Sequence, residues 1–112
     1  MKEKSLKYLS DILIAIDLIE DFTDGILEFY EYETDFKTQS AVERQLGIIG
    51  EALNQFRKIE PTIEILHERQ IVAFRNRLIH SYDGIDNSIV WAILKKQLAP
   101  LQLEIKILTL VS

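Results

Sequence analysis

Cysteine is absent from this chain of 112 residues, and histidine occurs only twice, as His67 and His80. The absence of cysteine excludes disulfides, thiolate metal sites and a cysteine nucleophile, and it is typical of a protein of a reducing cytoplasm. The two histidines are thirteen residues apart, which matches no common zinc-binding pattern. Glycine-rich loops that bind nucleotide phosphates are also missing. We therefore expect a cytoplasmic protein with no metal site and no cofactor.

Glycine and proline are scarce, with four and two residues respectively, which leaves little room for the tight turns of β-sheets. Long apolar runs are missing as well. None approaches the ~18 residues needed to cross a bilayer, so we expect no membrane segment. The first apolar region carries Asp11, Asp17 and Glu20, which is too much charge for a signal peptide.

Positive charge is in short supply, because 13 Lys and Arg face 18 Asp and Glu, for a net charge of −5. An acidic chain is a poor general binder of nucleic acid, since affinity for the phosphate backbone comes from Lys and Arg that displace counterions. Any binding to RNA would therefore need a local basic patch.

Hydrophobic residues recur at helical spacing through almost the whole chain, whose length suits one domain over residues 1–112. The spacing predicts a first helix over about 5–21 and a short helical piece over 26–32. Three further helices follow, with brief connections between them. The simplest fold is an all-α, up-and-down bundle of four long helices and a short one.

The third helix gives the clearest pattern. Asp35, Thr38 or Ser40 would cap its start, and Pro61 would mark its end. Five apolar residues inside it step by four, three, four and three, which is a heptad seam that we expect to be buried. They are Val42, Leu46, Ile49, Leu53 and Phe56.

Two glycines, Gly47 and Gly50, lie inside this third helix. A glycine in a helix interior costs about 1 kcal/mol relative to alanine, so two of them indicate close approach of another group. That group is a neighbouring backbone or a ligand on one interpretation. Tight packing against another helix is the simpler alternative.

The fourth helix is predicted to run from residue 62 or 64 to 82, and Gly84 would allow the chain to turn after it. Asp86 to Ser88 would cap the last helix. Pro100 falls inside the apolar stripe of that last helix, so we expect a kink or a break there.

The last helix is more apolar than one small core requires. Surplus apolar surface usually marks contact with a partner, so we expect a homodimer or a higher oligomer. The residues concerned are Leu98, Leu101, Leu103, Ile105, Ile107, Leu108, Leu110 and Val111.

Groups able to do chemistry crowd together only in residues 75–82, Arg-Asn-Arg-Leu-Ile-His-Ser-Tyr, on a predicted helix end. At 100° per residue, a core-facing arc of about 80° to either side of Ile71 takes in four further apolar or aromatic residues. They are Phe74, Leu78, Ile79 and Tyr82.

The polar residues of the stretch divide between two sides of the helix. Asn76 and His80 fall on the side away from the core, and Arg77 follows them, whereas Arg75 falls inside the apolar arc. A buried arginine needs a carboxylate partner. The candidates are Glu51, Glu43 and Asp11, and the spacing does not choose between them.

Arg75 and His80 lie about 140° apart on a straight helix. If the two act together, the helix is irregular at its end or a second subunit completes the site, and we favour the second explanation.

Metal-free phosphoryl chemistry suits these groups best. A histidine such as His80 can take a proton from a ribose 2′-hydroxyl or give one to the leaving oxygen. An arginine such as Arg75 can neutralise the charge of the transition state, with Asn76 and Arg77 in support. An endoribonuclease that leaves a cyclic phosphate is chemically reasonable. The alternative is a merely polar helix end, in which the cations oppose the helix dipole and His80 caps carbonyls.

Residues 75–82 also resemble the Arg-x4-His-x-Tyr signature of the HepT-like toxin branch of the HEPN superfamily. Residues 38–44 and 48–52 resemble the preceding helix of that branch, and residues 83–91 resemble the acidic turn after the motif. The likeness thus covers nearly the whole chain. It implies a HEPN-like helical domain that dimerises so that two motifs face each other across a cleft.

In this family the motif implies a metal-independent ribonuclease. Arg75 and His80 carry over as the catalytic pair, and Asn76 matches the polar position beside the arginine. The family also implies a partner, an MntA-like nucleotidyltransferase antitoxin that transfers AMP to the motif tyrosine, here Tyr82. Ser81 stands where glycine is common in the family, a departure that falls at the predicted helix end.

Two other interpretations remain open. The first is a non-catalytic binding module that docks on a nucleotidyltransferase and helps to hold nucleotide or substrate. The second is a plain helical dimerisation domain, which explains the surplus apolar surface but gives no reason for Arg75 to lie in an apolar arc.

Overall fold

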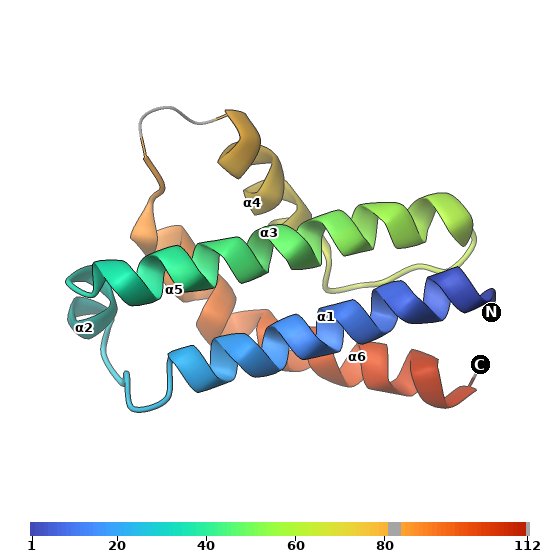
Figure 1. Ribbon diagram of the computed structural model, residues 1–112, viewed down its shortest axis with the longest axis horizontal. Coiled ribbons are helices and arrows are strands. Elements are labelled where there is room, and N and C mark those ends of the chain that lie inside the picture. Colours follow the sequence, from blue (N-terminus) through green and yellow to red (C-terminus); the bar gives the residue numbers. More distant parts are fainter. Residues whose placement is uncertain (81–83, 112) are drawn as a thin grey trace.

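The computed structural model describes residues 1–80 and 84–111, which form six α-helices and no strand (Figure 1). This confirms the all-α bundle predicted from the sequence. The helices are α1 (Glu3–Phe22), α2 (Phe29–Glu33), α3 (Phe36–Ile59), α4 (Arg69–His80), α5 (Asn87–Lys96) and α6 (Leu98–Val111). No helix within the described residues is both long and apolar enough to cross a membrane.

The core lies mainly between α1 and α3, which run side by side, with α6 along α1 (Figure 1). The predicted heptad seam of α3 is confirmed, since all five of its residues are buried. α1 contributes a buried stripe of isoleucine and leucine to the same core. Burial of each such side chain stabilises the fold by about 1.5–3 kcal/mol. The stripe consists of Leu9, Ile12, Ile16 and Ile19.

Side-chain caps fix the starts of two helices. The Asp35 carboxylate accepts the Thr38 N–H at 3.1 Å and its hydroxyl at 2.6 Å, so Asp35 is the cap of α3. Asp86 does the same for α5, where it accepts the Ser88 N–H at 2.9 Å and the hydroxyl at 2.6 Å. The hydrogen bonds from Thr38 lower the pKa of the Asp35 carboxyl.

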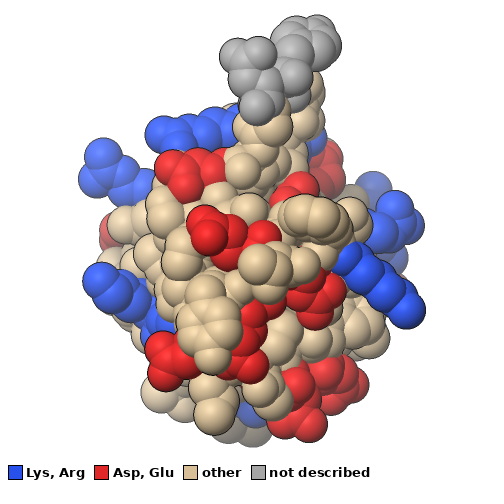
Figure 2. All heavy atoms as spheres, turned by 90° about the vertical axis from the view of Figure 1, so that its left-hand side faces the viewer, with Lys and Arg blue, Asp and Glu red and all other residues tan. Residues whose placement is uncertain are grey.

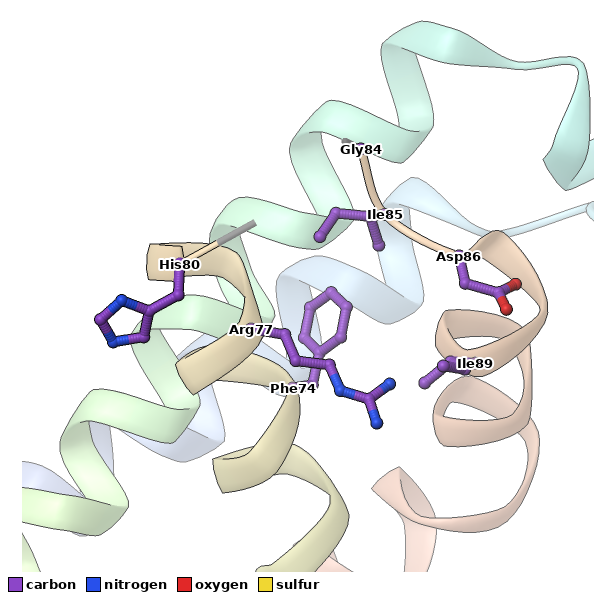
Figure 3. A pocket seen from close by; sticks show the side chains of 7 residues that line it. All are labelled: Phe74, Arg77, His80, Gly84, Ile85, Asp86 and Ile89. Carbon is purple, nitrogen blue, oxygen red and sulfur yellow. The ribbon is translucent and has the colours of Figure 1, made fainter. Parts of the chain in front are cut away.

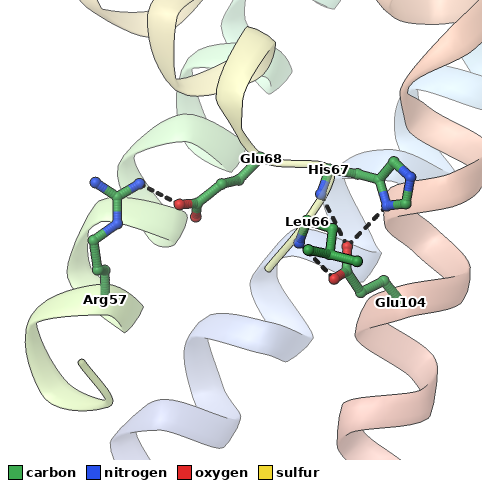
Figure 4. A network of polar contacts seen from close by, with 5 residues as sticks. All are labelled: Arg57, Leu66, His67, Glu68 and Glu104. Atoms are coloured by element: carbon green, nitrogen blue, oxygen red, sulfur yellow. Dashed lines mark hydrogen bonds and ion pairs between the residues drawn. The ribbon is translucent and has the colours of Figure 1, made fainter. Parts of the chain in front are cut away.

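The fourth helix begins later than predicted, at Arg69 in place of residue 62 or 64. A tertiary contact overrides the helical pattern here (Figure 4). The Glu104 carboxylate of α6 accepts the backbone N–H of Leu66 at 2.6 Å and of His67 at 3.1 Å, and it lies 3.0 Å from His67 Nδ1. Since these N–H groups bond to Glu104, the segment before α4 stays non-helical. The predicted end of the helix at residue 82 lies outside the described residues.

The break in the last predicted helix falls at Gln97, between α5 and α6, and not at Pro100. Proline has no N–H for the carbonyl four residues earlier, and its ring collides with that carbonyl. It is tolerated in the first turn of a helix, where the N–H has no helical partner. Pro100 therefore lies in the first turn of α6, and the bundle has six helices where five were expected.

α4 crosses α3 at the two glycines. A Cβ atom added to Gly50 would lie 2.9 Å from Cγ of Arg75 and 3.3 Å from the carbonyl oxygen of Ile71. It would lie even closer to Cβ of Arg75. A Cβ on Gly47 would lie 3.4 Å from Cδ1 of Leu78, an ordinary contact. Tight helix packing thus accounts for Gly50.

Charge is divided unevenly along the chain. Residues 8–36 contain nine Asp and Glu and no Lys or Arg, so the rest carries thirteen cations against nine carboxylates. Figure 2 shows carboxylates gathered on the end of the molecule that includes α2. The net charge of −5 therefore comes from residues 8–36, and the rest of the sequence is net basic.

The two glycines give a matched test of the crossing. Gly50→Ala should lower the free energy of unfolding by about 1–3 kcal/mol, because the new methyl group overpacks against Arg75. Gly47→Ala should leave it unchanged or raise it by up to about 1 kcal/mol, since alanine is the better helix former. Urea denaturation measures both. Equal stabilities of the two variants would contradict the close crossing.

Candidate active site at the end of α4

α4 packs chiefly against α3, and its last turn projects beyond the bundle (Figure 1). Ile71 and Phe74 are buried and anchor the helix, as the predicted arc requires, and Leu78 is partly buried. Ile79 was expected in the core but is 52% exposed. The projecting turn carries Ile79 past the helices that would cover it, so only the base of α4 is held in the core.

Arg75 is the best-fixed of the predicted site residues. Its guanidinium forms an ion pair with Glu51 of α3, and Nη1 donates to Asn76 Oδ1 at 3.3 Å. Gln55 Nε2 in turn donates to Glu51 at 2.8 Å. Glu51 is thus the partner among the three candidates considered. The Arg75 side chain is 26% exposed, so a substrate can still reach it.

Arg77 and His80 border a hollow of about 260 Å³ between the end of α4 and the start of α5 (Figure 3). Arg77 reaches across it towards Asp86, whose pKa is lowered by the side-chain and backbone hydrogen bonds of Ser88 and, to a smaller extent, by Arg77. His80 lies at the rim with its ring turned outward. Its ring has no hydrogen-bond partner among the residues that the structure describes.

Arg75 opens onto a different hollow, of about 450 Å³, between α1, α3 and α4. Within one protomer the structure therefore does not bring Arg75 and His80 into a single site. This is the separation expected of a straight helix. Residues on that hollow include Tyr8, Asp11, Arg44, Ile48, Glu51 and Arg75.

Other predicted site residues fall elsewhere. Tyr82, with Ser81, lies outside the described residues. His67 was interpreted as a surface residue, and it is a half-exposed partner of Glu104 that lines neither hollow. In the described part of the chain, no three His, Asp or Glu side chains are grouped closely enough to hold a metal ion.

Sequence reasoning gave no role to Arg44 and Tyr8, which also line the Arg75 hollow. One signal was available. One face of α3 carries Arg44 and the residues three, four and seven positions after it, which are Gly47, Ile48 and Glu51. Once Glu51 is known to bind Arg75, that face is the floor of the hollow.

A family model described as ribonuclease HepT-like matches residues 12–108. The chain belongs to this family. The resemblance to the HepT-like branch of the HEPN superfamily is therefore confirmed, and the match includes all of α3, α4 and α5.

Individual relatives agree with the family. A protein of Thermococcus cleftensis, named as a probable ribonuclease HepT, is 41% identical over 106 residues, covering 91% of this chain and 93% of its own. A candidate RNase of Methanocaldococcus jannaschii is 34% identical over 112 residues, covering 96% of this chain and 99% of its own. No solved structure matches this HepT-like chain significantly.

The Arg75–Glu51 pair can be measured with a double-mutant cycle of Arg75→Gln and Glu51→Gln. Because the side chains are 26% and 44% exposed, solvent screens the pair, and we expect a coupling of about 1 kcal/mol. The control is Lys7→Gln with Asp11→Asn, a more exposed i,i+4 pair, for which a smaller coupling is expected. Urea denaturation gives both values. A coupling at Arg75 no larger than the control would mean that Glu51 does not hold the arginine.

Proposed function

We propose that this HepT-like protein is a metal-independent endoribonuclease, that it acts as the toxin of a toxin–antitoxin pair, and that residues 1–112 form one domain that works as a homodimer. Membership of the ribonuclease HepT-like family supports the reaction class. The names of both relatives, which describe ribonucleases, support it too. The substrate is RNA, cleaved within the strand.

One observation carries the proposal: Arg75 is fixed at one hollow, while His80 is exposed at another. A two-fold dimer places residue i of one subunit beside residue j of its partner, twice over. Pairing the projecting ends of two α4 helices would set Arg75 of each subunit near His80 of the partner subunit. Two equivalent Arg–His sets would then face one cleft.

Such a cleft supports in-line cleavage. The ribose 2′-oxygen attacks phosphorus and gives its proton to the His80 of one Arg–His set. The bond to the 5′-oxygen breaks, and this oxygen takes a proton from water, which leaves a 2′,3′-cyclic phosphate. Histidine is a common general base in such proton transfers. Arg75, aligned by Glu51 and Asn76, neutralises the charge that develops on the phosphoryl oxygens.

A dimer through α4 leaves the surplus apolar surface of α6 uncovered. Leu103, Ile107, Leu110 and Val111 are all at least half exposed. In Figure 1, α6 lies on the far side of α1 and α3 from the end of α4. A contact through α6 would keep the two motifs apart, so it would serve to join dimers into a higher oligomer.

Regulation would act at Tyr82. An MntA-like nucleotidyltransferase antitoxin would direct the tyrosine oxygen to the α-phosphorus of ATP, forming O-AMP-tyrosine, with pyrophosphate leaving and the phenolic proton passing to solvent. Adenylate two residues beyond His80 would add negative charge and bulk in the path of RNA. Inhibition would follow from repulsion of the phosphate backbone.

Cleavage of total cellular RNA in EDTA tests the enzyme. Wild type should cleave, whereas His80→Ala and Arg75→Ala should each lose at least about 100-fold in rate, the usual worth of a general acid–base. Arg57→Ala is the control, because its guanidinium pairs with Glu68 away from both hollows, and it should keep the wild-type rate. Retained cleavage in His80→Ala would contradict the role of His80 in proton transfer. No cleavage by protein shown to be unmodified by intact mass would favour the binding module.

The shared site has its own test. Mixing the two inactive variants, His80→Ala and Arg75→Ala, should restore about a quarter of the wild-type activity, since half of the dimers are mixed and each has one intact Arg–His set. Subunits must be exchanged by mild denaturation and refolding first. If the mixture stays as inactive as its parts, Arg75 and His80 act within one chain and the dimer cleft is wrong.

A further inference from the structure

We infer that Arg44 binds a phosphate of the RNA substrate beside the one held by Arg75, so that the hollow between α1, α3 and α4 is a subsite of the cleavage cleft. This inference rests on the proposed ribonuclease function and adds to it a residue that selects how the strand is threaded.

Position is the first argument. Arg44 and Glu51 stand two turns apart on one face of α3, with Gly47 and Ile48 between them. Gly47 has no side chain, so the floor of the hollow stays open from Arg44 to Arg75. The volume of about 450 Å³ is large enough for more than one phosphate group and its ribose. Both guanidinium groups therefore border the same open space.

Charge is the second argument. The two carboxylates of the hollow already have partners. Lys7 Nζ donates to Asp11 at 2.8 Å, and Glu51 accepts from Arg75 and Gln55. Arg44, by contrast, is exposed and makes no ion pair or side-chain hydrogen bond within residues 1–80 and 84–111. An unpaired cation in a hollow whose anions are neutralised attracts an anionic ligand.

The apolar lining of the hollow gives the class of ligand. Ile48 is 38% and Ile79 52% exposed, and the ring of Tyr8 lies on the same hollow. Sites for single-stranded nucleic acid combine cations that track the backbone with apolar and aromatic surface for the bases. The acidic end of the molecule, where carboxylates gather around α2, disfavours such a strand there (Figure 2). Single-stranded RNA thus fits the hollow better than a free nucleotide.

The test compares Arg44→Gln with Lys58→Gln, which removes one exposed cation from the far end of the same helix. With a fluorescent single-stranded RNA, Arg44→Gln should raise KM about 3–10-fold and change kcat less than twofold, since it removes binding remote from the broken bond. Arg44→Lys should restore most of the loss. Lys58→Gln should match wild type.

Salt dependence supplies the second measurement. In a His80→Ala background, Arg44→Gln should reduce the slope of log affinity against log salt by about one, as expected for the loss of one phosphate contact. Light scattering should show an unchanged oligomer. If wild type cleaves RNA but the Arg44→Gln variants show the same KM and the same salt slope as the matching Lys58→Gln variants, the inference is overturned and the ribonuclease proposal stands.

Two further outcomes would also overturn it. A loss of the oligomer in Arg44→Gln would make Arg44 an interface residue. Absence of both cleavage by wild type and RNA binding by His80→Ala would overturn the ribonuclease proposal, and the subsite with it.

Discussion

The crossing of α3 and α4 at Gly50 is the constraint on which the site depends. Only a residue without a side chain allows the backbone of α4 to come so near α3. At this crossing the Cβ and Cγ atoms of Arg75 pack directly against the backbone of Gly50. Arg75 then meets Glu51 one residue further along α3, and Asn76 closes the other side of the guanidinium. A partly buried arginine is tolerated because its charge is compensated. The same crossing points His80, five residues on, away from that contact.

Local sequence signals were enough for much of this architecture. The α3 seam, the caps at Asp35 and Asp86 and the end of α3 near Pro61 all depend on residues close together in the chain. Two boundaries were missed, and only the first of them is decided by residues far apart in the chain. Glu104 holds the segment before α4 out of a helix across 37 residues of sequence. Pro100 was recognised as a disruption, but the break falls three residues earlier, because proline is tolerated in the first turn of a helix and α6 therefore starts just before it.

Local sequence signals also predicted part of the site. Helical geometry separated Arg75 from His80 and showed that Arg75 needs a carboxylate partner, but it did not distinguish Glu51, Glu43 and Asp11 as that partner. Choosing Glu51 requires the register of α4 on α3, which the glycine contact sets. Arg44 could not be singled out until that register was known. Ile79 was placed in the core because a helical wheel treats every turn as covered, whereas Ile79 in the last turn of α4 is 52% exposed among the described residues.

A net charge of −5 argues against an RNA-binding protein only if the charge is spread evenly, and here it is not. Nine carboxylates without one cation occupy residues 8–36, whereas the remaining residues carry thirteen cations against nine carboxylates. Interactions between exposed charges fade beyond about 10 Å in 0.1 M salt. A strand bound at α4 would therefore respond to Arg44, Arg75 and Arg77 more than to the acidic end, which would oppose entry from its own side. The same charges that make the chain acidic overall would thus give the cleft a direction.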